Sequence, residues 1–273
     1  MIKICPECQQ TFEPNRNSRI FCSRFCSNRM ITRNREQKKD NLPVTTVWSC
    51  GGGVQSTAIA VLIAQGKLPK PDYSIMVDTG WEKTGVLDYV NNVIKPGLLI
   101  VGVDLQMLRT NDYSNNDLFD KGNHLRIPAH KDVYPKPIKY RTHCNETWKV
   151  KVTKRWMRMN GVLQCENWIG VSKDERRRIK VSRYKWIRNR YPLVELGMNR
   201  EDCLWLICSH GWPKPQRSSC VFCPLQNDEG WISVRSSPTD WQRALSVEET
   251  IRQHEPNIYL HRSLKPLLEI FTK

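Results

Sequence analysis

The sequence predicts an α/β protein, in which a parallel sheet carries helices on both faces and a small cysteine-rich domain precedes it. Two observations predict the sheet. The apolar run Val44–Trp48 enters a glycine turn followed by an Ala-rich run, and further apolar strands then alternate with helical stretches. Such alternation implies parallel strands joined by right-handed crossovers. The third observation, a set of four cysteines before residue 27, predicts the separate domain.

The composition favours a polyanionic partner. The 273 residues suggest one or two domains, and 43 Lys and Arg against 27 Asp and Glu give a formal net charge of +16. This excess favours nucleic acid, DNA or RNA, although a basic protein without such a partner remains an alternative. We expect no membrane association, because the sequence has no long apolar span. The N-terminus lacks the apolar core of a signal peptide, which predicts a cytoplasmic location where eleven cysteines indicate metals rather than disulfides.

Residues 1–40 form the predicted small domain, similar to a zinc ribbon. Its two close cysteine pairs can close a tetrahedral site, with the ligands Cys5, Cys8, Cys22 and Cys26. Zinc is the favoured ion and iron the alternative. So short a segment cannot fold by hydrophobic burial alone, so the metal supplies folding energy. Basic residues follow and suggest nucleic-acid contacts, with a structural or protein-docking role as the alternative: Arg29, Arg33, Arg35, Lys38 and Lys39.

Residues 49–57, which we name the glycine loop, are the centre of the predicted site. Their sequence is Ser-Cys-Gly-Gly-Gly-Val-Gln-Ser-Thr. Glycines let backbone N–H groups approach an anion closely, and Ser56 and Thr57 stand at a helix N-terminus that favours phosphate. The loop lacks the Gly-Lys-Ser/Thr of a Walker motif. We therefore predict a pyrophosphate site of another kind, with an ordinary glycine turn as the alternative.

The remaining elements follow in order. Within a domain at 44–200 we expect strands at 44–49, 74–77, 98–103 and 164–171, helices at 56–65 and 85–94, and a basic helix opening at residue 141. Residues 110–140 lack periodicity, which predicts a long functional loop or lid, with disorder as the alternative. Residues 201–273 form a mostly helical, cysteine-containing C-terminal region with helices at 241–254 and 264–271. Ligands of such a sheet bind beyond the carboxyl ends of its strands.

Two motifs resemble the PP-loop (N-type) ATP pyrophosphatases, in their phosphoadenosine phosphosulfate (PAPS) reductase-like branch. Gly52, Gly53 and Ser56 lie on the SGGxxS pattern, and residues 78–82 match its DTGxE segment. The resemblance implies a Rossmann-like fold of the adenine nucleotide alpha hydrolase (HUP) type, ATP and Mg²⁺. The implied nucleotide contacts are Ser49, Gly51, Gly52, Gly53, Gln55, Ser56, Thr57, Asp78, Thr79 and Gly80. The implied catalytic residues are Ser56, Asp78, Asp174 and Glu175. Two positions depart from the family: Gln55 replaces an Asp, and Arg176 replaces the Ser of a Gly-Ile-x-x-Asp-Glu-Ser segment.

A second cysteine set lies in the body of the chain. Cys220 and Cys223 form a C-x₂-C pair followed by Pro224, as Fe–S ligands often do. A pair needs two further ligands, and Cys144, Cys165, Cys203 and Cys208 are the candidates. The resemblance selects Cys144 and Cys203, because similar proteins carry cysteines after Arg-x and Arg-x-Asp segments. It implies a 4Fe–4S cluster, with a four-cysteine zinc site as the alternative.

The resemblance implies an ATP pyrophosphatase that adenylates a nucleic acid or nucleotide for sulfur transfer, with a sulfur donor or cysteine desulfurase as partner. Basic and His residues would contact phosphate: Lys149, Lys151, Lys154, Arg155, Arg176, Arg177, Arg217, His261 and Arg262. One alternative is a sulfonucleotide reductase, which uses a cysteine near its C-terminus, whereas no cysteine follows Cys223. The other is a nucleic-acid-binding module with a degenerate loop, suggested by Gln55.

Overall fold

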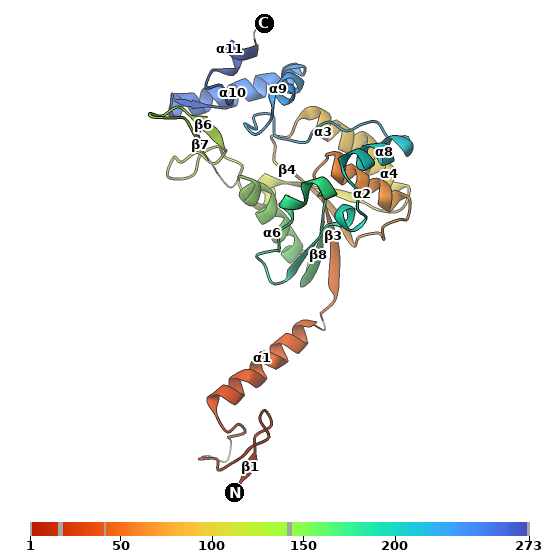
Figure 1. Ribbon diagram of the computed structural model, residues 1–273, viewed down its shortest axis with the longest axis vertical. Coiled ribbons are helices and arrows are strands. Elements are labelled where there is room, and N and C mark those ends of the chain that lie inside the picture. The colour runs from red at the N-terminus through yellow and green to blue at the C-terminus, as the bar shows by residue number, and fades with distance from the viewer. Residues whose placement is uncertain (1, 16–18, 41, 141–143, 272–273) are drawn as a thin grey trace. The chain divides into compact units, whose positions relative to one another are not determined.

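The computed structural model describes residues 2–15, 19–40, 42–140 and 144–271, and it divides into two compact units, Met1–Val44 and Thr45–Lys273. In the first unit, β1 (Lys3–Ile4) pairs antiparallel with β2 (Thr11–Phe12), and the helix α1 (Arg24–Asp40) follows. The second unit contains both the predicted sheet domain and the predicted C-terminal region (Figure 1).

A five-stranded sheet is the centre of the second unit and confirms the predicted Rossmann-like class. Its strands run in the order β5-β4-β3-β8-β9. Their bounds are β3 (Val44–Cys50), β4 (Tyr73–Asp78), β5 (Leu105–Arg109), β8 (Gln164–Ile169) and β9 (Ile187–Arg190). Strand β4 pairs in parallel with β3 and β5, and β8 pairs in parallel with β9. The glycine loop, which follows β3, and the segment after β4 therefore leave the sheet at the same edge.

Helices cover both faces of this sheet (Figure 1). One side holds α2 (Val54–Ala64), α3 (Thr84–Tyr89), the π-helical turn η1 (Val90–Ile94), α4 (Lys95–Leu99), α7 (Pro192–Glu195) and α8 (Arg200–Ser209). The other side holds α6 (Lys151–Met159), which continues directly from the π-helical turn η2 (Glu146–Val150). Alternate strand residues serve the two cores, since Trp48 belongs to the first and Val47 to the second. Within the described residues, no helix combines the length and the apolar composition that crossing a bilayer requires.

A second, smaller layer packs around its own core. The strands β6 (Ala129–Lys131), β7 (Ile138–Tyr140) and β10 (Ile258–Tyr259) form an antiparallel sheet in the order β10-β6-β7. The helices α9 (Asp228–Arg235), α10 (Pro238–His254) and α11 (Leu267–Phe271) accompany it. The expected loop at 110–140 thus contains a short helix, α5 (Thr110–Tyr113), and two strands of this sheet.

The predicted strand at 98–103 is wrong. Residues 95–99 form α4, Gly102 makes a turn at a φ of +74°, and the third parallel strand is β5. The apolar run misled the prediction because Leu98 and Val103 are both buried, in the core between the sheet and its helices. A short apolar run does not distinguish a buried helix end from a strand.

We predict that Trp48→Ala lowers the free energy of unfolding of the second unit by about 3–5 kcal/mol, because this fully buried side chain leaves a cavity in the main core. Val44→Ala is the control in the same strand, since Val44 is 55% exposed, and it should change stability by less than ~0.5 kcal/mol. Urea denaturation followed by circular dichroism measures both. Equal losses would contradict the assigned core.

Candidate functional site

The glycine loop has a tightly closed backbone. Gly52 has a φ of +68°, and a Cβ atom there would lie 2.7 Å from Cγ1 of Val86, so this position requires glycine. The Ser56 hydroxyl accepts a hydrogen bond from the Gly51 N–H at 2.9 Å and so holds the loop against the start of α2. Thr57 is fully buried, and its hydroxyl donates to the Gly53 carbonyl at 3.0 Å. Ser56 therefore faces the loop, whereas the Thr57 hydroxyl is used inside the helix.

Two neighbouring residues of the β8 segment position the loop. The Ser49 hydroxyl donates to Oδ1 of Asn167 at 2.7 Å, which joins β3 to β8 beside the loop. A Cβ atom on Gly170 would lie 3.0 Å from the backbone nitrogen of Ser56. This close approach allows residues 170–175 to run beside the first turn of α2.

Gln55, which departs from the resembling family, ties the loop to this segment. Its side-chain nitrogen donates to Oγ of Ser172 at 3.3 Å and to Oε2 of Glu175 at 3.1 Å, while Arg200 donates to its oxygen at 3.4 Å. Asp174 is exposed, in the 3-10 turn η3 (Lys173–Arg178), and accepts from the Arg200 N–H at 3.1 Å. Its hydrogen bond with Ser172 lowers the pKa of the Asp174 carboxyl. The two predicted acidic residues thus lie beside Gln55.

The segment after β4 is anchored by the C-terminal layer. Asp78 accepts a hydrogen bond from the Gly80 N–H at 2.8 Å, and Gly80 turns the chain at a φ of +77°. Arg243 of α10 donates to the carbonyls of Gly80 at 2.7 Å and Glu82 at 3.0 Å. Asp240 accepts from the N–H of Thr84 at 3.0 Å. The predicted nucleotide contacts Asp78, Thr79 and Gly80 therefore lie on a segment that α10 holds in place.

Three of the predicted cluster ligands, Cys144, Cys220 and Cys223, lie in one neighbourhood, and we name them the thiol cluster. Cys144 and Cys220 pack against the same apolar core, which contains Trp148 and Phe222. Burial, reinforced by the charge of Glu82, raises the pKa of Cys220 to about 12. Burial also raises the pKa of Cys223, with a contribution from Cys144. Residues 141–143, which precede the first ligand, lie outside the described part.

The fourth predicted ligand, Cys203, is placed elsewhere. It lies on α8, fully buried in the core between α2 and the sheet. Burial raises its pKa to about 12, and the charged residues around it are Asp202, Asp174, Arg200 and Glu175. The structure therefore does not bring Cys203 to the thiol cluster. Cys165 is buried in β8, as predicted, and Cys208 is exposed.

An ion pair between the partly exposed Lys149 and the buried Glu82 connects the thiol cluster with the sheet edge. Nζ of Lys149 lies 2.6 Å from Oε1 of Glu82, whose side chain is fully buried. The charge of Glu82 raises the pKa of Lys149, against the effect of burial and with further contributions from Cys220 and Cys144. The same ammonium group acts on Cys50 of the glycine loop, where it opposes the burial that raises the thiol pKa to about 12. Lys149 was predicted as a phosphate contact, whereas Glu82 was assigned no role from the sequence, although it lies in the DTGxE segment.

The glycine loop and the thiol cluster adjoin each other. A Cβ atom on Gly53 would lie 2.7 Å from Oγ of Ser218, two residues before Cys220. A Cβ atom on Gly85, at the start of α3, would lie 2.8 Å from the side chain of Gln216. The 216–220 segment therefore passes over both the loop and α3 and then delivers Cys220 into the thiol cluster.

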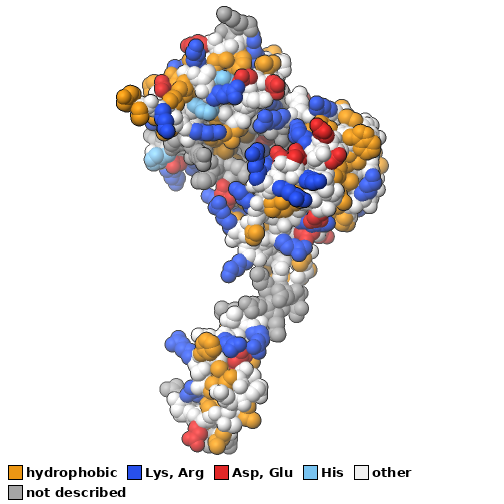
Figure 2. Space-filling view, in the orientation of Figure 1, with side chains coloured by type: hydrophobic (Ala, Val, Ile, Leu, Met, Phe, Trp, Pro, Cys, Tyr) orange, Lys and Arg blue, Asp and Glu red, His pale blue; other side chains and the backbone are white. Residues whose placement is uncertain are grey.

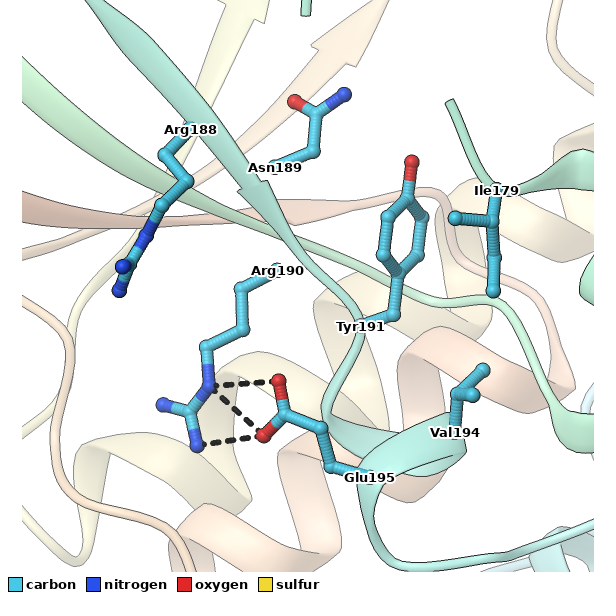
Figure 3. Close-up of a pocket in the computed structure, with 7 residues that line it drawn as sticks. All are labelled: Ile179, Arg188, Asn189, Arg190, Tyr191, Val194 and Glu195. Carbon is cyan, nitrogen blue, oxygen red and sulfur yellow. Dashed lines mark hydrogen bonds and ion pairs between the residues drawn. The ribbon is translucent and has the colours of Figure 1, made fainter. Parts of the chain in front are cut away.

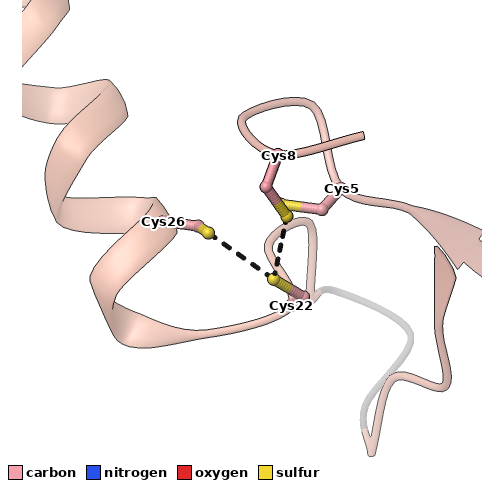
Figure 4. Close-up of side chains that lie close together, drawn as sticks. All are labelled: Cys5, Cys8, Cys22 and Cys26. Carbon is pink, nitrogen blue, oxygen red and sulfur yellow. Dashed lines mark hydrogen bonds between the residues drawn. The ribbon is translucent and has the colours of Figure 1, made fainter. Parts of the chain in front are cut away.

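The N-terminal cysteines form a separate group whose thiols lie close together (Figure 4). The Sγ atoms of Cys5, Cys8, Cys22 and Cys26 all lie within 4.8 Å of one another, and this is the one such group among the described residues. Two of the Sγ–Sγ distances, Cys8–Cys22 and Cys22–Cys26, are 3.5 Å. Four closely spaced thiols suit a tetrahedral zinc ion. The neighbouring Glu7 accepts from Arg33 at 3.0 Å and pairs with Arg29 at 3.3 Å, while the side chains of Arg35, Lys38 and Lys39 lie outside the described part.

The predicted phosphate contacts on α6 and η3 are exposed or partly exposed, but several also bind the protein itself. Lys154 lies 3.3 Å from the centroid of the Tyr184 ring, and Arg155 donates to the carbonyl of Tyr113 at 2.8 Å. Lys151, Arg176 and Arg177 are exposed. Lys and Arg side chains are spread over the visible face of the second unit, with acidic side chains among them (Figure 2).

The other predicted phosphate contacts lie nearer the C-terminus and pair with neighbours. Arg262 donates to Oδ2 of Asp228 at 2.9 Å, and His261 lies 3.1 Å from Oδ1 of the same carboxylate. Arg217 lies 3.5 Å from Oδ1 of Asn227. His261 is buried and Arg262 is exposed, and both side chains pair with Asp228 at the start of α9.

A shallow cavity of about 370 Å³ lies at the edge strand β9 (Figure 3). Its lining residues are Ile179, Arg188, Asn189, Arg190, Tyr191, Val194 and Glu195. Arg190 pairs with Glu195 at 2.9 Å and lies 5.1 Å from the Trp168 ring. The Tyr191 hydroxyl donates to the Lys180 carbonyl at 2.9 Å. These polar groups bind other residues of the 179–195 segment, so they stabilise that segment and are not free to bind a ligand in the cavity.

No protein-family model and no curated protein sequence matches this chain. Solved structures do resemble it. A PAPS reductase from Candida auris in a phosphate complex is 15% identical, with 70% of this chain and 89% of that chain covered and a TM-score of 0.43. The U34-tRNA thiolase NcsA from Methanococcus maripaludis with its [4Fe-4S] cluster is 16% identical, with 94% of this chain and 84% of that chain covered and a TM-score of 0.41.

We predict that Cys22→Ser removes a metal ion from the first unit, because Cys22 lies close to two other thiols and one lost thiolate opens the site. Metal analysis should then show one zinc per chain less than in the unmutated protein. Cys208→Ser is the matched control, since Cys208 is exposed and outside every cysteine group described above. Retention of zinc in Cys22→Ser would contradict the assignment.

Proposed function

We propose that the second unit binds ATP at the glycine loop and adenylates an oxygen of a nucleic acid or nucleotide, which sulfur then replaces. The observation that carries this proposal is the junction of two kinds of site. A loop built for phosphate lies under residues 216–220, and those residues lead directly to the thiol cluster. An ordinary glycine turn does not explain why the ammonium group of Lys149 acts both on Cys50 in the loop and on the neighbouring thiols Cys144 and Cys220.

The chemistry begins at the α-phosphorus of ATP. A substrate oxygen forms a bond to this phosphorus, the bond to the β-phosphate oxygen breaks, and pyrophosphate leaves with the electron pair. The backbone N–H groups of Gly52 and Gly53 and the hydroxyl proton of Ser56 would bind the pyrophosphate at the start of α2, while the Gly51 N–H orients the Ser56 side chain. Mg²⁺ prefers oxygen ligands, which the carboxylates of Asp78, at the end of β4, and Asp174, in η3, would supply. The contribution of the protein is mainly positioning and charge stabilisation.

The thiol cluster suits an iron–sulfur centre better than a single zinc ion. Its three Sγ atoms do not meet the close mutual spacing that the N-terminal group shows. A centre with several irons spreads its thiolate ligands more widely than one ion does. When bound, such a cluster would supply or relay the sulfur that displaces AMP. The positive charge of Lys149 would stabilise negative charge on phosphate or thiolate groups between the glycine loop and the thiol cluster.

Nucleic acid is the substrate class that the charge favours. The net charge of +16 would attract a phosphate backbone, and the exposed side chains of Lys151, Arg176 and Arg177 would contact it. The first unit, with Arg29 and Arg33 beside its metal site, would add to this contact.

ATP turnover tests the proposal. The anaerobically purified protein should convert ATP to AMP and pyrophosphate, faster when tRNA or single-stranded DNA is added. A sulfonucleotide reductase would instead consume PAPS with a thiol reductant and leave ATP intact. Production of ADP, or no turnover with either polymer, would contradict the proposal.

We predict that Ser56→Ala lowers ATP affinity roughly tenfold, because the variant loses the proposed hydrogen bond to phosphate, worth about 1–2 kcal/mol, and the bond from Gly51 that orders the loop. Gly53→Val should abolish binding, since any Cβ atom there meets Ser218 at 2.7 Å. Isothermal titration calorimetry measures both affinities. Gly66→Ala is the control, because a Cβ atom there meets nothing within 4 Å, although its φ of +68° costs some stability. Unchanged affinity in the two loop variants would show that ATP binds elsewhere.

A further inference from the structure

Glu82 has an acceptor atom that the described residues do not satisfy. Its side chain is fully buried, and Oε2 has no hydrogen-bond partner among them. Leaving a buried carboxylate oxygen unpaired costs free energy, so such an atom indicates a missing ligand. Its neighbours identify the kind of ligand, because they include the thiols Cys220 and Cys223, whose pKa values the Glu82 charge helps to raise.

The backbone fixes Glu82 beside Cys220. The two residues form an antiparallel bridge, and the Val221 N–H donates to the Trp81 carbonyl at 2.8 Å. Directly opposed residues of an antiparallel pair point to the same face, with Cβ atoms about 4.5–5.5 Å apart. The Thr79 hydroxyl spans the two side chains, 3.3 Å from Oε1 of Glu82 and 3.7 Å from Sγ of Cys220. The carboxylate therefore belongs to the same site as the thiol.

The other oxygen of Glu82 is held firmly. Oε1 lies 2.6 Å from Nζ of Lys149 and accepts the hydrogen bond from Thr79. Carboxylates that bind metals are usually oriented in this way, by hydrogen bonds to the oxygen that does not bind the metal. Lys149 and Thr79 thus both bind Oε1, which leaves Oε2 as the oxygen that can bind a metal.

We propose that Oε2 of Glu82 is the fourth protein ligand of a metal centre whose other ligands are Cys144, Cys220 and Cys223. This inference rests on the iron–sulfur centre of the proposed function. It replaces Cys203, which lies in the other core. Carboxylate oxygen is a harder ligand than thiolate and suits a soft, sulfur-bound iron less well. One iron of the centre therefore keeps a ligand that a sulfur anion can displace without any change of oxidation state.

The test is Mössbauer and EPR spectroscopy of the full chain, reconstituted anaerobically with iron and sulfide. In the unmutated protein, one iron should differ from the others, with an oxygen ligand. Glu82→Gln should lose that iron preferentially on mild oxidation. Glu82→Cys should retain the cluster but with all irons sulfur-ligated, so that the distinct signal disappears. Cys203→Ala is the matched control and should keep both the iron content and the distinct signal.

Glu82→Gln leaves Lys149 without its buried partner and could destabilise the fold. The double variant Glu82→Gln/Lys149→Met removes both charges, and circular dichroism checks that it is folded. It should show the same iron loss as Glu82→Gln. An unmutated protein that binds no iron outside the first unit would overturn the cluster and this inference together. A cluster with only sulfur-ligated irons, unchanged in Glu82→Gln or lost in Cys203→Ala, would overturn the inference alone.

Discussion

The ion pair between Lys149 and Glu82 joins the parts of the candidate site. Lys149 comes from η2, Glu82 from the segment between β4 and α3, and both lie against Cys220 from a third segment. Because Glu82 is fully buried, removing Lys149 would leave a buried charge uncompensated, which typically costs about 3–5 kcal/mol. The pair therefore stabilises the point where three distant segments meet. The thiol Cys220 and the glycine-loop residue Cys50 both lie within reach of its charges.

The arrangement also explains the role of the C-terminal layer. Arg243 and Asp240 on α10 hold the turn that carries Glu82, while Lys83, which is 2% exposed, donates to the Gly230 carbonyl of α9 at 3.3 Å. Burial, with help from the charge of Arg217, lowers the pKa of Lys83. The layer packs its own apolar core and so anchors the segment that carries Glu82 at the edge of the sheet.

The sequence sufficed for the parts of the fold that rest on local signals. The apolar run into β3, the three glycines and the Ala-rich α2 are contiguous, so their order alone placed the glycine loop at the sheet edge. The four N-terminal cysteines are likewise close in sequence, and the structure brings them together. These elements depend on period, glycine turns and short spacing, which a single chain displays directly.

The parts that failed depend on contacts between distant residues. The apolar run at 98–103 is compatible both with a buried strand and with the end of a buried helix, and only its packing in the core with α2 decides between the two. The antiparallel sheet pairs Ile258 with Lys131, and such two- and three-residue strands leave no pattern to recognise. Cys203 was chosen by motif, yet α8 carries it into the other core, while Glu82 reaches the thiols through a single bridge.

If the glycine loop and the thiol cluster form one site, a ligand of the loop should change the electronic state of the cluster. EPR of the reduced, reconstituted protein, recorded with and without a non-hydrolysable ATP analogue, measures this change. We expect a saturating concentration of the analogue to shift the cluster signal, because Lys149 acts on both Cys50 and Cys220 and bound phosphates would alter its charge balance. An unchanged signal, with binding of the analogue verified by calorimetry on the same sample, would contradict this expectation.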